Sequence, residues 1–384
     1  MIDITILNKL NAPTCEERLA NLKEVLKDTV FPPMVPQYIN NHIHTTYSFS
    51  PYSPTASVYA ARMEGLCTAG IIDHDSISGA KEFIEAAKLV DIPVTIGMEA
   101  RVNMDGTRLE GRRTNNPDQI GVSYMTIQSV PHDKIDTLTA FFKPYQQARH
   151  ERNRQMIARI NALLPDIELD YDTDVLPLSM AHENGGVTER HLMYALAKKL
   201  VKQVGKGPSM IDKLQSLGLT LSKKQQTQML DENYPFYEYD LLGILKSAFV
   251  PKIYVDATDE CPKLADMVNL CEEIDAYLCY AYLGDVGDSV TGDKKAQKFE
   301  DDYLDDVFEC LKEEGVKSIT YMPTRNTPEQ LTRVRALCNK YGMFQISGED
   351  INSPRQSFVI RAMENPLFSN LIDATWKLIE HENK

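Results

Sequence analysis

Residues 38–44 read YINNHIH, residues 68–75 read TAGIIDHD and residues 94–102 read VTIGMEARV. Each stretch is short and apolar and ends in polar side chains. The segments between them, around 57–66 and 79–90, repeat their apolar residues at the 3.6-residue period of amphipathic helices. Alternation of short strands with helices is typical of βα units, which build a largely parallel sheet or barrel. This part of the chain therefore indicates an α/β fold.

The rest of the chain divides by the same rhythm. It stops near residue 140, where charged helical runs begin, and it returns in the last third with AYLCYAYLG, SITYMP and MFQISGED. We therefore expect a helical insertion inside an interrupted barrel. The expected division is an N-terminal helical extension over 1–37, a barrel over 38–140 and 251–384, and an insertion over 141–250 that covers the site.

Composition excludes several classes of protein. The 384 residues carry a formal net charge of −14, which repels the phosphate backbone of duplex nucleic acid. No run of about 20 uncharged apolar residues predicts a membrane helix, and the first residues have no signal-peptide pattern, so a cytoplasmic location is expected. The seven cysteines are odd in number and form no C-x-x-C, which disfavours a disulfide framework or a thiolate zinc site.

Polar residues with metal-binding capacity follow four of the expected strands. His42 and His44 are two apart on one strand, so both rings point to the same face. The sequence Asp-His-Asp follows the second strand, Glu99 ends the third, and Asp350 follows the last. In barrels of βα units the carboxyl ends of the strands meet on one rim. One such residue is a common accident, but four predict a site for Zn, Mn or Fe.

Other candidate residues have two interpretations. His191 lies in a helix whose apolar face could carry it inward, and from the residues alone a histidine in a helix cap or at the edge of the core is favoured. Arg101, Arg112 and Arg113 follow the Glu99 strand closely enough to bind a phosphate oxygen, although each singly has a surface role as its alternative.

The order of these motifs resembles the PHP superfamily, the polymerase and histidinol phosphatase type of metallohydrolase. HIHTTYS, GIIDHDSISG and GMEA are the most specific pieces, and the resemblance is closest to the single-domain phosphoesterase branch. It covers about 38–130, 145–200 and 245–360. It implies a distorted TIM-like barrel of seven βα units, with up to three ions at the site.

The resemblance also implies which residues bind the ions. The first ion would be held by His42, His44, Glu99 and Asp350, and a second, which shares Glu99, by His191. Three ligand positions of the family hold other residues here, namely Phe49, Tyr282 and Asn352. We therefore expect one firmly held divalent ion, a weaker second and no third.

With the third site lost, His74 becomes available for other chemistry. It would act as a general acid for the leaving group or donate a hydrogen bond to phosphate, and the alternative is a strand-end histidine held by Asp73 or Asp75. The leading hypothesis is hydrolysis of a small phosphate ester, a nucleotide, sugar phosphate or short oligonucleotide, by metal-bound hydroxide. The alternatives are hydrolysis of a non-phosphate bond and a degenerate barrel that binds metal or ligand without turnover.

Overall fold

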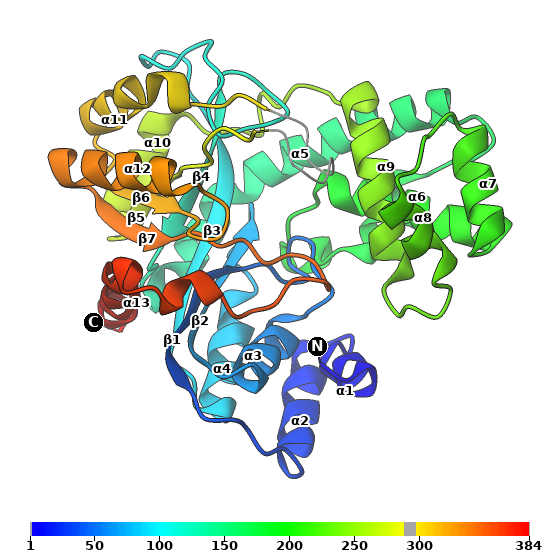
Figure 1. Ribbon diagram of the computed structural model, residues 1–384, viewed down its shortest axis with the longest axis horizontal. Coiled ribbons are helices and arrows are strands. Elements are labelled where there is room, and N and C mark those ends of the chain that lie inside the picture. Colours follow the sequence, from blue (N-terminus) through cyan, green and yellow to red (C-terminus); the bar gives the residue numbers. More distant parts are fainter. Residues whose placement is uncertain (1, 288–296, 384) are drawn as a thin grey trace.

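One curled sheet forms the centre of the computed structural model, which describes residues 2–287 and 297–383 (Figure 1). The sheet follows chain order from β1 to β7. β1, β2 and β3 are parallel, as are β5, β6 and β7, and β4 is antiparallel to both of its neighbours. The strands are β1 (Val35–Ile43), β2 (Leu66–His74), β3 (Val94–Asn103), β4 (Val122–Gln128), β5 (Tyr277–Ala281), β6 (Ser318–Tyr321) and β7 (Phe344–Ser347).

The two edges of this sheet approach each other beyond β7. The backbone N–H of His44 donates to the carbonyl of Ile351 at 2.9 Å, and the N–H of Ile351 donates to the carbonyl of His42 at 3.0 Å. Ile351 thereby forms a parallel bridge with Ile43. This contact brings the segment after β7 beside the end of β1 and gives the sheet the character of a distorted barrel. The expected α/β fold is confirmed.

One βα unit departs from the expected pattern. β4 has no counterpart among the strands named from the sequence, and it follows β3 through the loop 104–121 without a helix. It therefore returns antiparallel, as Met98 opposite Ile127 and Ala100 opposite Met125 show. The distortion of the barrel is concentrated at this reversed strand.

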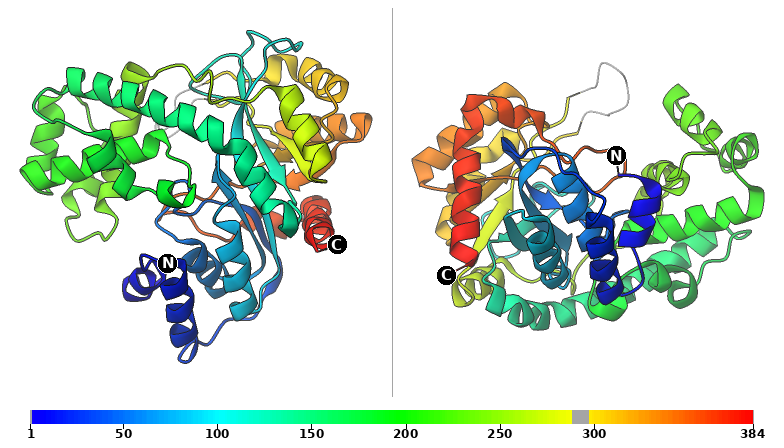
Figure 2. Two further views of the ribbon diagram at one scale, coloured as in Figure 1. Left: turned by 180° about the vertical axis from the view of Figure 1, so that it is seen from behind. Right: turned by 90° about the horizontal axis from the view of Figure 1, so that it is seen from below.

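Helices surround the sheet and extend away from it on one side (Figures 1 and 2). α12 illustrates their local signals: a Thr327–Gln330 capping box and Pro328 start it, and Gly342 ends it at φ 67°. The longer helices are α1 (Ile4–Leu10), α2 (Cys15–Leu26), α3 (Pro54–Met63), α4 (Ala80–Val90), α5 (Ile135–Leu163), α6 (Glu189–Val204), α7 (Pro208–Ser216), α8 (Lys223–Leu230), α9 (Tyr237–Ile253), α10 (Leu264–Glu273), α11 (Leu304–Glu313), α12 (Pro328–Tyr341) and α13 (Ser369–Glu382).

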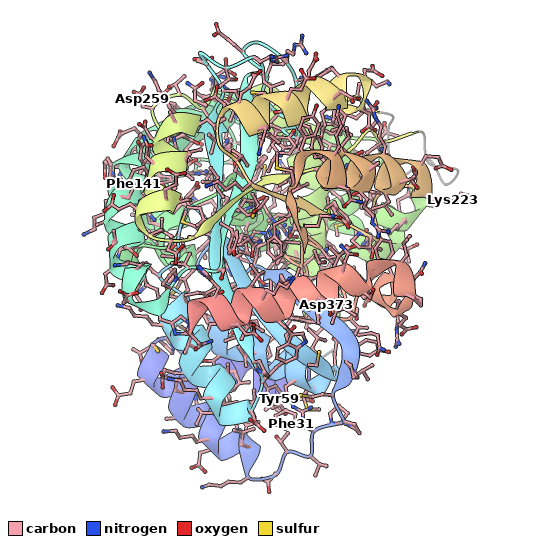
Figure 3. All side chains as sticks on the ribbon, turned by 90° about the vertical axis from the view of Figure 1, so that its left-hand side faces the viewer. Phe31, Tyr59, Phe141, Lys223, Asp259 and Asp373 are labelled. Carbon is pink, nitrogen blue, oxygen red and sulfur yellow. The ribbon has the colours of Figure 1, made fainter. Side chains whose placement is uncertain are left out.

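Two helices connect peripheral segments to the sheet. α13 packs across β1, β3 and β7, and Figure 3 shows it crossing the sheet with Asp373 labelled on its exposed side. α2 is fastened to α4 by a buried ion pair in which Arg18 donates to both oxygens of Glu82, at 2.8 and 2.5 Å. Leu22 of the same helix joins the main core, so the N-terminal segment packs on the barrel.

The hydrophobic core has two large clusters. One surrounds the sheet, and the other is formed by α5 to α9 together with Phe49. α5 belongs to both, because Leu138 and Phe142 pack in the first cluster while Met156 and Ile160 pack in the second. The expected boundary at residue 141 falls inside this unbroken helix. The expected division into extension, barrel and insertion stays a prediction. None of the described helices is long and apolar enough to cross a membrane.

Candidate metal centre

Five side chains with metal-binding capacity meet at one rim of the sheet. His42 lies on β1 and His44 directly follows it, while His74 is the last residue of β2. Glu99 lies on β3 opposite His74 in the strand register, and Asp350 follows β7. These strands are parallel, so their carboxyl ends converge on the same edge.

The ligand atoms form two overlapping groups. Atoms of His42, His44 and Asp350 lie within 4.8 Å of one another, and so do atoms of His44, His74 and Glu99. Nε2 of His44 is 3.2 Å from Oδ1 of Asp350. Nδ1 of His74 is 3.1 Å from Oε2 of Glu99, and Nε2 of His42 is 3.7 Å from the same oxygen. Because His44 belongs to both groups, the five side chains form one continuous cluster.

The cluster contains buried polar atoms without hydrogen-bond partners. Both ring nitrogens of His42 and Nε2 of His44 are in this state, although the two residues are only 4% and 1% exposed. A buried polar atom without a partner costs free energy, and proteins keep few of them. A divalent ion bound by imidazole nitrogens and carboxylate oxygens would satisfy these atoms. The residues present therefore fit such an ion.

Hydrogen bonds behind the cluster orient its ligands. Nδ1 of His44 is 3.2 Å from Oγ of Ser48, which donates to Asp73 at 2.6 Å. Asp73 also accepts from the backbone N–H and the hydroxyl of Thr45, at 2.7 and 2.6 Å. This chain turns Nε2 of His44 toward Asp350, the arrangement by which outer partners hold metal-binding histidines.

Burial and neighbouring charges set the protonation of the cluster. Burial lowers the pKa of His74 to about 3, so its ring is neutral at pH 7. Burial alone would raise the pKa of Asp350, but the adjacent histidine rings lower it below its usual value, and Glu99 follows the same balance. Burial would lower the pKa of His44, yet Asp350 raises it. An ion bound at His44 would compete with protonation of its ring.

A cavity of about 550 Å³ opens over the cluster. His42, His74, Glu99 and Asp350 lie in its wall. Its lining also contains three cationic side chains: Arg190 of α6, Lys246 of α9 and Arg325 of the loop after β6. Within the described ranges, none of these three cations has a carboxylate within 4.0 Å. The cavity is therefore suited to an anionic ligand.

The three replaced ligand positions have defined contacts. The hydroxyl of Tyr282 donates to Oδ1 of Asp301 at 2.6 Å. Asn352 donates from its amide to both oxygens of Asp350, at 2.9 and 3.0 Å. Phe49 belongs to the helical cluster, with its ring centroid 5.4 Å from that of Tyr239. Two of the replacements thus line the cavity and the third lies beside it.

The structure does not bring His191 into the metal cluster. It lies in the first turn of α6, where its Nδ1 accepts the backbone N–H of Thr188 at 3.0 Å. Its ring meets that of Phe49 edge-on, with centroids 4.9 Å apart. Among the described residues it is in neither group of candidate ligands. The helix-capping interpretation accounts for this histidine better than the ligand expected from the resemblance.

The arginines expected to bind phosphate also have other partners. Arg101 is buried and pairs with Glu189 at 3.2 Å and Glu260 at 2.6 Å. Arg112 pairs with Asp306 at 2.6 Å, and Arg113 donates to the carbonyls of residues 116 and 117. None of the three lines the cavity as the structure describes it.

Sequence reasoning missed the cations that do line the cavity. None of Arg190, Lys246 and Arg325 is among the candidate residues named from the sequence. Arg325 lies in the loop after β6, so its place after a predicted strand was a signal that could have found it. No local pattern marks Arg190 and Lys246, because their position depends on how α6 and α9 pack against the rim.

The fold and the rim cluster together define a barrel protein of the metal-binding α/β class. A family model described as the PHP domain matches residues 40–316, which is more than half of the chain. The protein therefore belongs to the PHP domain family, as its sequence motifs indicated. This match includes four residues of the rim cluster, His42, His44, His74 and Glu99, but ends before Asp350.

Relatives of known sequence match short parts of the chain. The error-prone DNA polymerase of Mycobacterium tuberculosis is 31% identical over 96 residues, which cover 24% of this chain and 8% of the polymerase. The 5'-3' exoribonuclease of Haemophilus influenzae is 38% identical over 65 residues, 17% of this chain and 24% of the enzyme. The chain thus matches less than a quarter of either relative's length.

Solved structures resemble nearly the whole fold. A protein of Bifidobacterium adolescentis assigned as a metal-dependent phosphoesterase has a TM-score of 0.54 at 17% identity, over 89% of this chain and 98% of that one. An amidohydrolase of Chromobacterium violaceum, solved with sulfate and without metal, has a TM-score of 0.53 at 16% identity, over 88% and 96%. At these identities the likeness establishes the fold.

Proposed function

We propose that this protein is a metal-dependent phosphoesterase that hydrolyses a small phosphate ester, such as a nucleotide, a sugar phosphate or a short oligonucleotide. The observation that carries the proposal is a histidine and carboxylate cluster beside a cavity wall that holds three cations, none with a carboxylate within 4.0 Å among residues 2–287 and 297–383. Membership of the PHP domain family supports the hydrolase class. The three cations favour a phosphate substrate, because they would neutralise its negative charge.

In this proposal the ion is held by His42, His44, Glu99 and Asp350, whose ligand atoms converge at the rim. A divalent ion, Mn, Zn or Fe, supplies Lewis-acid polarisation and lowers the pKa of a coordinated water. His74 is neutral and close enough to Glu99 to serve either as a further ligand or as a hydrogen-bond donor to the substrate. The cationic wall neutralises phosphoryl charge, which is the main electrostatic demand of phosphoryl transfer.

An anion bound in a structural neighbour agrees with this substrate class. The amidohydrolase of Chromobacterium violaceum holds sulfate, which has the shape and charge of a phosphoryl group. A cavity of about 550 Å³ accommodates a nucleotide-sized molecule or smaller and leaves no room for a duplex.

The test is phosphate release by protein purified with Mn²⁺, against nucleotides, sugar phosphates and short oligonucleotides. Asp350→Asn keeps the size of the side chain but removes the charge, and we expect it to lose activity. Glu24→Gln is the matched control, because Glu24 is an exposed carboxylate on α2 that pairs only with Lys27. No release from any ester by folded wild-type protein would reject the proposal, as would an Asp350→Asn variant with full activity.

A second candidate is hydrolysis of a non-phosphate bond. The name amidohydrolase given to one structural neighbour favours it, and so does the replacement of three ligand positions, because one intact site suffices for such chemistry. Turnover of amides or esters by a protein that releases no phosphate, with loss of that turnover in Asp350→Asn, would identify it. A folded protein that binds Mn²⁺ and turns over neither class would be the non-catalytic binding barrel.

A further inference from the structure

Among the described residues Arg190 has no carboxylate within 4.0 Å, in contrast to the arginines that lie behind the rim on β3 and α5. Arg101, Arg149 and Arg152 lie in the same region and each pairs with Glu189 or Glu260. The Nε of Arg190 is buried and has no hydrogen-bond partner. A partly buried cation without an opposing charge is costly for the free protein. Such a cost is expected where a ligand supplies the missing anion.

The start of α6 is fixed firmly enough to present this side chain. The carboxylate of Glu189, the residue before Arg190, accepts from Arg152 at 2.8 Å and from Arg101 and Arg149 at 3.2 Å. Just upstream, Gly186 packs against the backbone of His74, where an added Cβ would lie 2.1 Å from the carbonyl oxygen. The helix start is therefore held directly against the metal rim.

A short chain of hydrogen bonds joins Arg190 to the metal cluster. Its two terminal nitrogens donate to the side-chain oxygen of Asn352 at 2.5 Å and to the backbone carbonyl of Asn352 at 3.1 Å. The amide of Asn352 in turn donates to both oxygens of Asp350. The guanidinium also lies over the ring of Phe49, 4.9 Å from its centroid. Arg190 thus rests on Asn352 and Phe49 beside a metal-capable carboxylate.

We propose that Arg190 is the anion-binding side chain of this site, which Asn352 and Phe49 hold in position to receive the phosphoryl oxygens of the substrate. Phe49 has no lone pair for a metal ion, and Asn352 directs its amide nitrogen to Asp350 and its side-chain and backbone oxygens to Arg190. These two positions therefore support a guanidinium in place of an ion. The guanidinium stays charged at every working pH and matches two oxygens of a phosphate. The identity of the anion rests on the proposed function, whereas the binding of an anion does not.

The experiment measures the affinity of Mn²⁺-loaded protein for inorganic phosphate by titration calorimetry. Arg190→Gln keeps an N–H donor for Asn352 and removes the charge, and we expect it to weaken phosphate binding about 10- to 100-fold. Arg190→Lys keeps the charge but loses the planar guanidinium that can bind two oxygens, and its phosphate affinity should lie between those of Arg190→Gln and wild type. Arg154→Gln is the control for loss of one arginine, since Arg154 is exposed and pairs with Glu151 and Asp172 on the outside of α5. It should bind phosphate as wild type does.

A second titration, with Mn²⁺ alone, separates anion binding from a structural role. Arg190→Gln should bind Mn²⁺ as tightly as wild type or more tightly, because a repelling cation has been removed. Unchanged phosphate affinity in Arg190→Gln would overturn the inference. A parallel loss of Mn²⁺ and phosphate affinity would also overturn it, because Arg190 would then act through Asp350.

The two proposals fail separately in these measurements. Weaker phosphate binding by Arg190→Gln, from a wild-type protein that hydrolyses no phosphate ester, would keep the anion site and reject the phosphoesterase. Phosphoesterase activity that is lost in Asp350→Asn, together with unchanged phosphate affinity in Arg190→Gln, would keep the phosphoesterase and reject the anion site at Arg190.

Discussion

Two buried polar regions lie next to each other in this protein and are built on opposite principles. At the rim, His42 and His44 keep ring nitrogens without hydrogen-bond partners. In the network between β3, α5 and α6, three arginines meet three acids, and the ion pairs join them across the elements. The network consists of Arg101, Arg149, Arg152, Asp75, Glu189 and Glu260.

We infer from this difference that the network stabilises the fold, whereas the rim binds a ligand. The three arginines and three acids of the network have no net charge, and each is offset by charges from other elements. Removal of one charge should therefore lower the free energy of unfolding. At the rim, buried ring nitrogens of His42 and His44 lack hydrogen-bond partners, and an ion bound there would supply them. Mutations in the two regions should therefore change different quantities.

The largest effect is expected in the network. Glu260→Gln leaves Arg101, at 2.6 Å, without its nearest charge partner. Breaking a buried pair by removal of one member costs about 3–5 kcal/mol in the free energy of unfolding. Urea denaturation measures this change. Glu24→Gln, in an exposed pair, should stay within about 1 kcal/mol of wild type. Equal stability of the two variants would mean that the network holds nothing together.

At the rim, Mn²⁺ should stabilise the folded protein. At 100 times its dissociation constant an ion that binds only the folded state adds about 2.7 kcal/mol to the free energy of unfolding. Urea denaturation with Mn²⁺ and with a chelator should give this difference for wild type. Asp350→Asn should show a much smaller stabilisation at the same Mn²⁺ concentration, because the group of His42, His44 and Asp350 loses its carboxylate. An identical shift in the variant would place the ion elsewhere.

A smaller effect is expected behind the rim, where Ser48 contacts His44. Ser48 is buried and donates its only hydroxyl hydrogen to Asp73, so its oxygen accepts from Nδ1 of His44. Ser48→Ala removes the outer partner of a metal-binding histidine, which typically lowers metal affinity about 10- to 100-fold. Competition with a fluorescent chelator measures the affinity. Ser57→Ala is the matched control, since Ser57 is also buried but bonds only to the carbonyl of Pro54 in its own helix. Equal Mn²⁺ affinities for the two variants would contradict an orienting role.

Local patterns in the sequence predicted the strands of the rim and most of its cluster. His42 and His44 share a face because side chains alternate along a strand. Asp350 follows β7, as expected, whereas Glu99 lies inside β3, which continues to Asn103, and it reaches the rim because the strand register places it opposite His74. The role of His191 was not predictable in this way. Its ring could cap α6 or reach the rim, and the sequence does not distinguish the two positions. Packing against Phe49 places the ring at the helix cap.

The sequence by itself determined the α/β class, the βα units and the convergence of histidines and carboxylates at one rim, because these follow from periodicity over a few residues. Tertiary structure decided the reversed β4, the closure at Ile351 and the partners of the arginines. Arg152 and Glu260 pair across 108 positions, and Arg190 meets Asn352 across 162. No local pattern encodes such contacts, because they depend on where α5 and α6 pack against the sheet.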